Sequence, residues 1–127
     1  LHEHKQNRVM IYLDSGDLQI KHESGKVEDQ HWKKGDIAWS VADGMHTSQN
    51  VSSSPLRIIE IELRNAGSAN TPGVKGAVLD NAQVSVYRGT SAPPAGTHFV
   101  AVDETAGAYT FDKLPDGAGP FVIVQLK

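Results

Sequence analysis

The fold is decided by residues 35–50, which read GDIAWSVADGMHTSQN. Gly35 and Asp36 predict a turn that opens a short strand. A second turn, at Gly44, ends that strand, and His46 begins the next one. Short runs rich in Val, Ile, Tyr and Thr recur on both sides of this segment, separated by Gly, Asp, Asn, Ser or Pro, and helical periodicity is almost absent. The pattern predicts an antiparallel, all-β protein.

The predicted strands fall into two series. The first series comprises residues 8–14, 17–22, 26–32, 37–40, 46–51 and 56–63, and the second comprises residues 84–90, 99–102, 109–112 and 121–126. Many short strands with a turn every few residues are typical of a sandwich or a barrel. The small, polar stretch of residues 65–75 is interpreted as a linker or long loop. We therefore predict a core at residues 1–64 and an additional β unit at residues 76–127.

Composition excludes several functional classes. The 127 residues carry a formal net charge of −3, which argues against nucleic acid as a partner because nucleic-acid-binding proteins present a basic face. No apolar run approaches the roughly 20 residues of a membrane-spanning helix, so no membrane partner is expected. The absence of cysteine excludes disulfides and cysteine nucleophiles. Because the chain starts at Leu1, we expect a soluble protein of the cytoplasm or the periplasm from which an upstream segment has been removed.

Three histidines form the candidate metal site. His2 and His4 stand two residues apart, so in a strand both side chains leave on the same face. His46 opens a separate strand, and imidazole is the commonest protein ligand of first-row metals. Two imidazoles from one strand and one from a neighbour suit Zn or a late first-row divalent ion. His22 and His31 lie near strand ends and are expected to be solvated.

Residues 35–50 resemble the second motif of the cupin superfamily, small β-barrel proteins that often hold one metal. That motif is Gly, five residues, Pro-x-Gly, two residues, His, three residues and Asn. Gly35, His46 and Asn50 match it. Val41 replaces the proline and Asp43 replaces the second glycine.

The first cupin motif is His-x-His, three or four residues, Glu, six residues and Gly. His2 and His4 match it, and Gly16 lies at or one place beyond its glycine. Arg8 or Val9 stands where the glutamate belongs. A guanidinium about 5 Å from a divalent ion would cost roughly 6–7 kcal/mol at an effective dielectric of about 20. Arg8 therefore turns away, or binds an anion in the cavity, or the site holds no metal.

The resemblance covers residues 1–64 and implies a double-stranded β-helix, or jelly-roll barrel. It implies a divalent metal (Zn, Fe, Mn or Ni) on His2, His4 and His46. It also implies a small, oxygen-rich ligand or substrate in a pocket formed by Gln6, Arg8, Tyr12, Met45 and Asn50. The fold does not decide whether the protein is an enzyme. The alternative is a non-catalytic binding or dimerisation barrel in which the metal site is vestigial and the metal absent.

The predicted barrel lacks its usual first strands. Cupins have strands before His-x-His, and here only Leu1 precedes His2, which leaves an open sheet edge. Residues 77–96 resemble the missing lead-in. They complete the barrel either within this chain or in a partner copy, as a strand-swapped homodimer. In a third alternative the lead-in is lost and the C-terminal half is a degenerate second cupin. We predict a homodimer.

Overall fold

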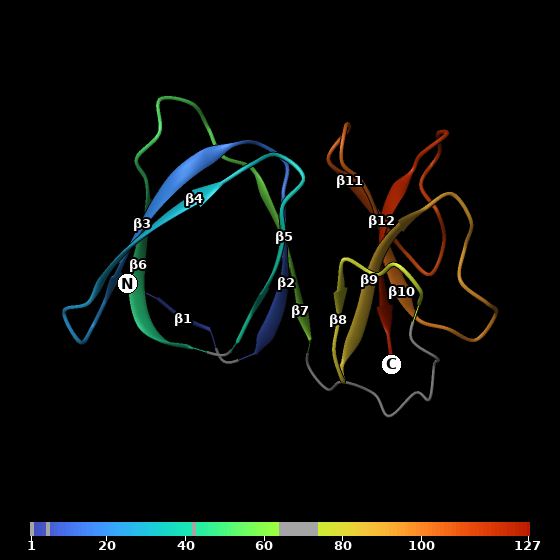
Figure 1. Cartoon of the computed structure of the whole chain (residues 1–127), viewed down its shortest axis with the longest axis horizontal. Coiled ribbons are helices and arrows are strands. Elements are labelled where there is room, and N and C mark those ends of the chain that lie inside the picture. The colour runs from blue at the N-terminus through green and yellow to red at the C-terminus, as the bar shows by residue number, and fades with distance from the viewer. Residues whose placement is uncertain (1, 5, 42, 64–73) are drawn as a thin grey trace. The chain divides into compact units, whose positions relative to one another are not determined.

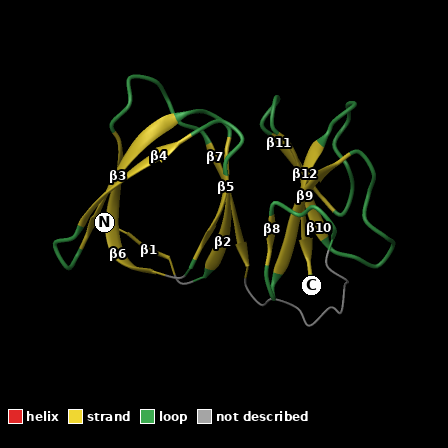
Figure 2. Ribbon diagram, viewed as in Figure 1, coloured by secondary structure: helices red, strands yellow, loops and turns green. Residues whose placement is uncertain are grey.

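The computed structural model describes residues 2–4, 6–41, 43–63 and 74–127, with residues 2–4, 43 and 44 described by their backbone alone. It contains twelve strands in three antiparallel sheets, and no helix occurs in the described residues (Figure 2). The all-β prediction is confirmed. The chain divides into two compact units, Leu1–Arg64 and Asn65–Lys127, here called the N-terminal and C-terminal units. Most of the expected linker falls on residues 64–73, outside the described residues.

The N-terminal unit consists of two sheets that lie opposite each other (Figure 1). The four-stranded sheet has the order β1-β6-β3-β4, with β1 at His2–His4, β6 at Asp43–Asn50, β3 at Gly16–His22 and β4 at Val27–Trp32. The three-stranded sheet has the order β5-β2-β7, with β5 at Ile37–Ser40, β2 at Asn7–Tyr12 and β7 at Ile58–Leu63. Strands β4 to β7 alternate between the two sheets along the chain.

The two sheets of the N-terminal unit remain separate in their hydrogen bonding. Within the residues that the structure describes, no strand pair joins one sheet to the other, so the strands are not closed into a barrel. The jelly-roll barrel therefore stays a prediction. Strand β2 is buried on both faces, since Arg8, Met10 and Tyr12 alternate with the equally buried Val9 and Ile11.

The C-terminal unit is built on one five-stranded sheet of order β11-β10-β12-β9-β8. Its strands are β8 at Leu79–Asp80, β9 at Val84–Gly89, β10 at Phe99–Asp103, β11 at Ala108–Phe111 and β12 at Phe121–Leu126. One face carries a hydrophobic cluster of Phe99, Ala101, Phe121 and Ile123, against which Tyr87 and Leu114 pack. This cluster gives the C-terminal unit a core of its own.

The C-terminal sheet contains part of residues 77–96, the segment that resembles the missing lead-in. Strand β9 pairs with β12 on one edge and with β8 on the other. The pairing with β12 runs along the whole of β9, whereas the pairing with β8 involves only Ser85 and Val86. The alternatives in which this segment completes the N-terminal sheets, within the chain or in a partner copy, stay predictions.

All predicted strands are present, and their observed ends differ from the predicted ends by at most three residues. The two remaining strands, β1 and β8, contain three and two residues. Segments this short cannot show an alternating hydrophobic pattern.

Candidate ligand-binding site

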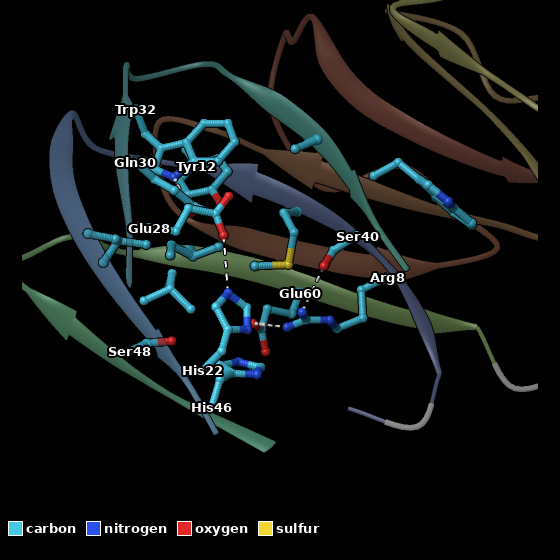
Figure 3. A pocket seen from close by; sticks show the side chains of 16 residues that line it. Arg8, Tyr12, His22, Glu28, Gln30, Trp32, Ser40, His46, Ser48 and Glu60 are labelled. Atoms are coloured by element: carbon cyan, nitrogen blue, oxygen red, sulfur yellow. Dashed lines mark hydrogen bonds and ion pairs between the residues drawn. The ribbon is translucent and has the colours of Figure 1, made fainter. Parts of the chain in front are cut away.

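A cavity of about 430 Å³ lies inside the N-terminal unit and is lined from both of its sheets (Figure 3). Six strands, β2 to β7, contribute to the lining. The lining side chains are Arg8, Met10, Tyr12, Leu18, Ile20, His22, Glu28, Gln30, Trp32, Ala38, Trp39, Ser40, His46, Ser48, Ile58 and Glu60.

The alternation of strand residues explains why these side chains face the cavity. In β4, Glu28, Gln30 and Trp32 line the cavity, while Asp29 and His31 between them are exposed. Strands β2, β3, β6 and β7 contribute every second residue in the same way. The cavity is thus built by the period of two that defines a strand.

An aromatic stack forms one end of the cavity. The rings of Tyr12 and Trp32 are stacked, with centroids 4.0 Å apart and an interplanar angle of 12°. Trp32 Nε1 donates a hydrogen bond to Gln30 Oε1 at 3.1 Å. Tyr12 is only 3% exposed, and this burial raises its pKa to about 12, against the smaller, opposing effect of the Arg8 charge. The phenol therefore stays neutral and keeps its proton to donate.

A charged pair lies along one side of the cavity. Arg8 Nη1 donates to Glu60 Oε1 at 2.9 Å, and Arg8 Nη2 donates to Ser40 Oγ at 2.9 Å. The Arg8 side chain is 7% exposed and that of Glu60 is 42% exposed. A guanidinium this well buried requires a counter-charge, and Glu60 supplies it.

Two histidines occupy the end opposite the aromatic stack (Figure 3). His22 and His46 are directly paired across β3 and β6, and their ring centroids are 5.9 Å apart. His22 Nε2 lies 3.3 Å from Glu28 Oε2, where the ring N–H donates to the carboxylate. This end of the cavity therefore combines two imidazole rings with a carboxylate.

The structure brings three of the predicted site residues together and places three others elsewhere. Arg8, Tyr12 and His46 line the cavity. Gln6 and Met45 are half-buried and are not among the lining residues. Asn50 lies at the end of β6, where its amide donates to the Ser54 carbonyl at 2.9 Å and its Oδ1 accepts from the Ser52 amide.

The predicted metal site falls partly on side chains that are not described. The side chains of His2 and His4 lie outside the described residues. Their backbone is described: His2 pairs with His46 and His4 pairs with Asp43, with an irregularity between the two pairs. Among the side chains that the structure does describe, no group of three His, Asp or Glu residues is arranged to hold a metal ion. The described donors therefore do not make a complete metal site by themselves.

Sequence reasoning missed the role of His22. This residue was expected to be solvated, but it lies in the cavity beside His46 and is half-buried. The alternation offers the signal that identifies it, because His22 shares a strand face with Leu18 and with the buried Ile20. His31 is exposed, as predicted, and its Nδ1 lies 2.7 Å from Asp17 Oδ1.

Comparison with protein-family models, with curated proteins and with solved structures gave no match for this chain. In the described part of the chain, no helix has the length and apolar character needed to cross a membrane.

Proposed function

We propose that the N-terminal unit is a small-molecule-binding domain whose oxygen-rich ligand occupies the cavity between its two sheets. The observation that supports this proposal is the lining itself: both sheets direct hydrogen-bonding side chains into a space of about 430 Å³. Ligand sites are typically clefts or cavities of about 300–1,000 Å³ with a few convergent polar groups. A catalytic role is not part of this proposal.

The strand arrangement supports a jelly-roll relationship for this unit. Strands β4 to β7 alternate between two facing sheets, and β2 pairs with β7 just as β3 pairs with β6. Consecutive strands that cross between two packed sheets are characteristic of jelly rolls. The cupin resemblance therefore stays part of the proposal.

A ligand screen tests the binding function directly. Trp32 lines the cavity and stacks on Tyr12, so ligand entry is expected to change tryptophan fluorescence. Ala38→Phe places a ring in the cavity and is expected to abolish binding. Val27→Phe, at an exposed position of β4, is the matched control and is expected to bind as the wild type does. If no compound in a broad metabolite library changes fluorescence or melting temperature, or if Ala38→Phe binds normally, the proposal is refuted.

A divalent metal is the second candidate ligand. It is favoured by the pairing of His46 with His22 on one side and with the backbone of His2 on the other. His46 is 5% exposed and would be the central donor, with His2 and His4 as its predicted partners. Metal analysis after incubation with Zn²⁺, Fe²⁺, Mn²⁺ or Ni²⁺ should give one ion per chain that His46→Ala loses and His98→Ala, in the C-terminal unit, retains. A metal-free wild-type protein would overturn this second candidate.

The predicted homodimer also remains a proposal. Strand β1 is at the edge of its sheet and is paired only with β6 in the described residues. An open edge can accept a strand from a second copy. Light scattering should then give a particle of twice 13.7 kDa, and a particle of 13.7 kDa at all concentrations would exclude the dimer.

A further inference from the structure

The charged side chains of the cavity are Arg8, Glu28 and Glu60, and each of them contacts another side chain. Arg8 is held by Glu60 at 2.9 Å, and Glu28 accepts from the His22 ring at 3.3 Å. An anionic ligand would compete with Glu60 for Arg8, and a cationic ligand would compete with Arg8 and His22 for the two carboxylates. Displacing Glu60 from Arg8 would leave the Glu60 carboxylate without compensation in a partly buried site, and Glu28 adds a second negative charge. The cavity therefore disfavours an anionic ligand.

The cavity nevertheless offers hydrogen bonds of both kinds along its length. Glu28 and Glu60, each 42% exposed, present carboxylate oxygens that only accept. Tyr12, with its pKa raised to about 12 by burial, presents a hydroxyl that keeps its proton. Gln30 carries an amide with two donor hydrogens. A hydroxyl group both donates and accepts, so several hydroxyls on one molecule match this mixed lining better than a carboxylate or an amine does.

Aromatic and aliphatic side chains supply the apolar part of the lining. The Tyr12–Trp32 stack stands opposite the histidine end, and Leu18, Ile20 and Ile58 add aliphatic side chains. Aromatic faces are electron-rich and attract the slightly positive edges of other groups, including C–H bonds next to oxygen. A cavity of about 430 Å³ is at the smaller end of the range of ligand sites and suits a single ring.

We propose that the ligand is a neutral, polyhydroxylated ring compound of the size and chemistry of a monosaccharide. This inference rests on the proposed binding function and narrows it to one ligand class. The carboxylates of Glu28 and Glu60 accept hydrogen bonds from its hydroxyls. The C–H face of its ring lies against the aromatic side chains of the cavity.

Tryptophan fluorescence with chosen probes tests the ligand class. The neutral probes are D-glucose, D-mannose, D-galactose and L-arabinose. The charged probes are D-glucuronate, D-galacturonate, malate and D-glucosamine, and benzyl alcohol is the apolar probe. Saturable binding of at least one neutral sugar, at least tenfold tighter than its own uronate, is the expected result. Preferential binding of a charged or apolar probe overturns the sugar inference and leaves the binding function standing. Failure of every probe here also overturns the sugar inference, whereas failure of the wider screen overturns both.

Two variants on one strand show whether the carboxylate of Glu28 contacts the sugar. Glu28→Gln removes the charged acceptor and is expected to weaken binding at least tenfold, because a hydrogen bond to a charged group is stronger than one to a neutral group. Asp29→Asn makes the same chemical change on the opposite face of β4, where the side chain is exposed, and is expected to leave the affinity unchanged. Equal affinities of the two variants, with both folded by circular dichroism, would overturn the assignment.

Discussion

Replacing Glu60 by glutamine tests the ion pair between Glu60 and Arg8. Arg8 Nη1 donates to Glu60 Oε1 at 2.9 Å, and the Arg8 side chain is almost fully buried. Glutamine preserves the shape of the side chain and an oxygen that accepts from Nη1. The substitution therefore removes the negative charge and changes little else.

The size of the effect follows from the exposure of the two partners. Two unit charges about 3 Å apart attract by about 6 kcal/mol at an effective dielectric of about 20, which is the upper limit. The desolvation of Arg8 and the exposure of Glu60 offset most of this attraction. A hydrogen bond to a charged group stabilises by about 1.5–3 kcal/mol, against about 0.5–1.5 kcal/mol between neutral groups. We therefore expect Glu60→Gln to lower the free energy of unfolding of the N-terminal unit by about 1–2 kcal/mol.

Urea unfolding followed by tryptophan fluorescence measures this change. Both tryptophans belong to the N-terminal unit, so the signal reports the unfolding of that unit. Glu23→Gln, in an exposed turn of the same unit, is the matched control and should change stability by less than about 0.5 kcal/mol. A double-mutant cycle with Arg8→Met should show a coupling of about 1 kcal/mol or more. Glu60→Gln as stable as Glu23→Gln, or a cycle without coupling, would refute the reasoning.

Three further substitutions test other parts of the fold. Burial raises the pKa of Tyr12 to about 12, above its ordinary value of 10, so the stability that this phenol contributes is present below pH 10 and is lost between pH 10 and 12. Tyr12→Phe should therefore abolish the loss of unfolding free energy, about 2–3 kcal/mol, that the wild type shows between pH 10 and 12. It should also remove one phenol that ionises late from the absorbance titration at 295 nm, and an unchanged titration would contradict the prediction. Gly16→Ala places a Cβ 2.9 Å from Ser52 Oγ, which accepts from the Asp17 amide, and should destabilise the N-terminal unit by about 1–3 kcal/mol in urea, with partial recovery in a double variant with Ser52→Ala. Ile123→Ala, at a fully buried position of the C-terminal cluster, should cost about 2–5 kcal/mol, measured by hydrogen exchange of the β12 amides; a cost below about 1 kcal/mol would show that the cluster is loosely packed.

Local patterns explain why the strands were predictable and their pairing was not. Residues 121–124 are all apolar, and the strand predicted over residues 121–126 is observed as β12 with the same ends. The partners of a strand depend on contacts between distant residues, such as Arg8 and Glu60, which are 52 positions apart. The spacing of apolar residues within a strand does not show which other strand it pairs with. The hydrophobic pattern therefore could not predict that β2 and β3 belong to different sheets.

The same distinction applies to the candidate site. The alternation along residues 8–12 placed Arg8 and Tyr12 on one face, and both line the cavity. The motif resemblance pointed to Asn50, which instead satisfies backbone groups of the loop after β6. A sequence motif specifies residue types and their spacing, whereas the alternation along a strand specifies which face of the sheet each side chain is on. Applied to β3, alternation also assigns His22 to the inside, which the position of this residue near a strand end had obscured.

The polarity of the cavity is itself an argument about function. The space of about 430 Å³ is partly open to solvent, so water can enter it and hydrate Glu28 and Glu60. Larger apolar residues at the same positions would fill the space and stabilise the sheets by burying apolar area. The ion pair with Arg8 accounts for Glu60, so Glu28 is the inward position that a ligand exchanging its hydroxyls for this water would explain.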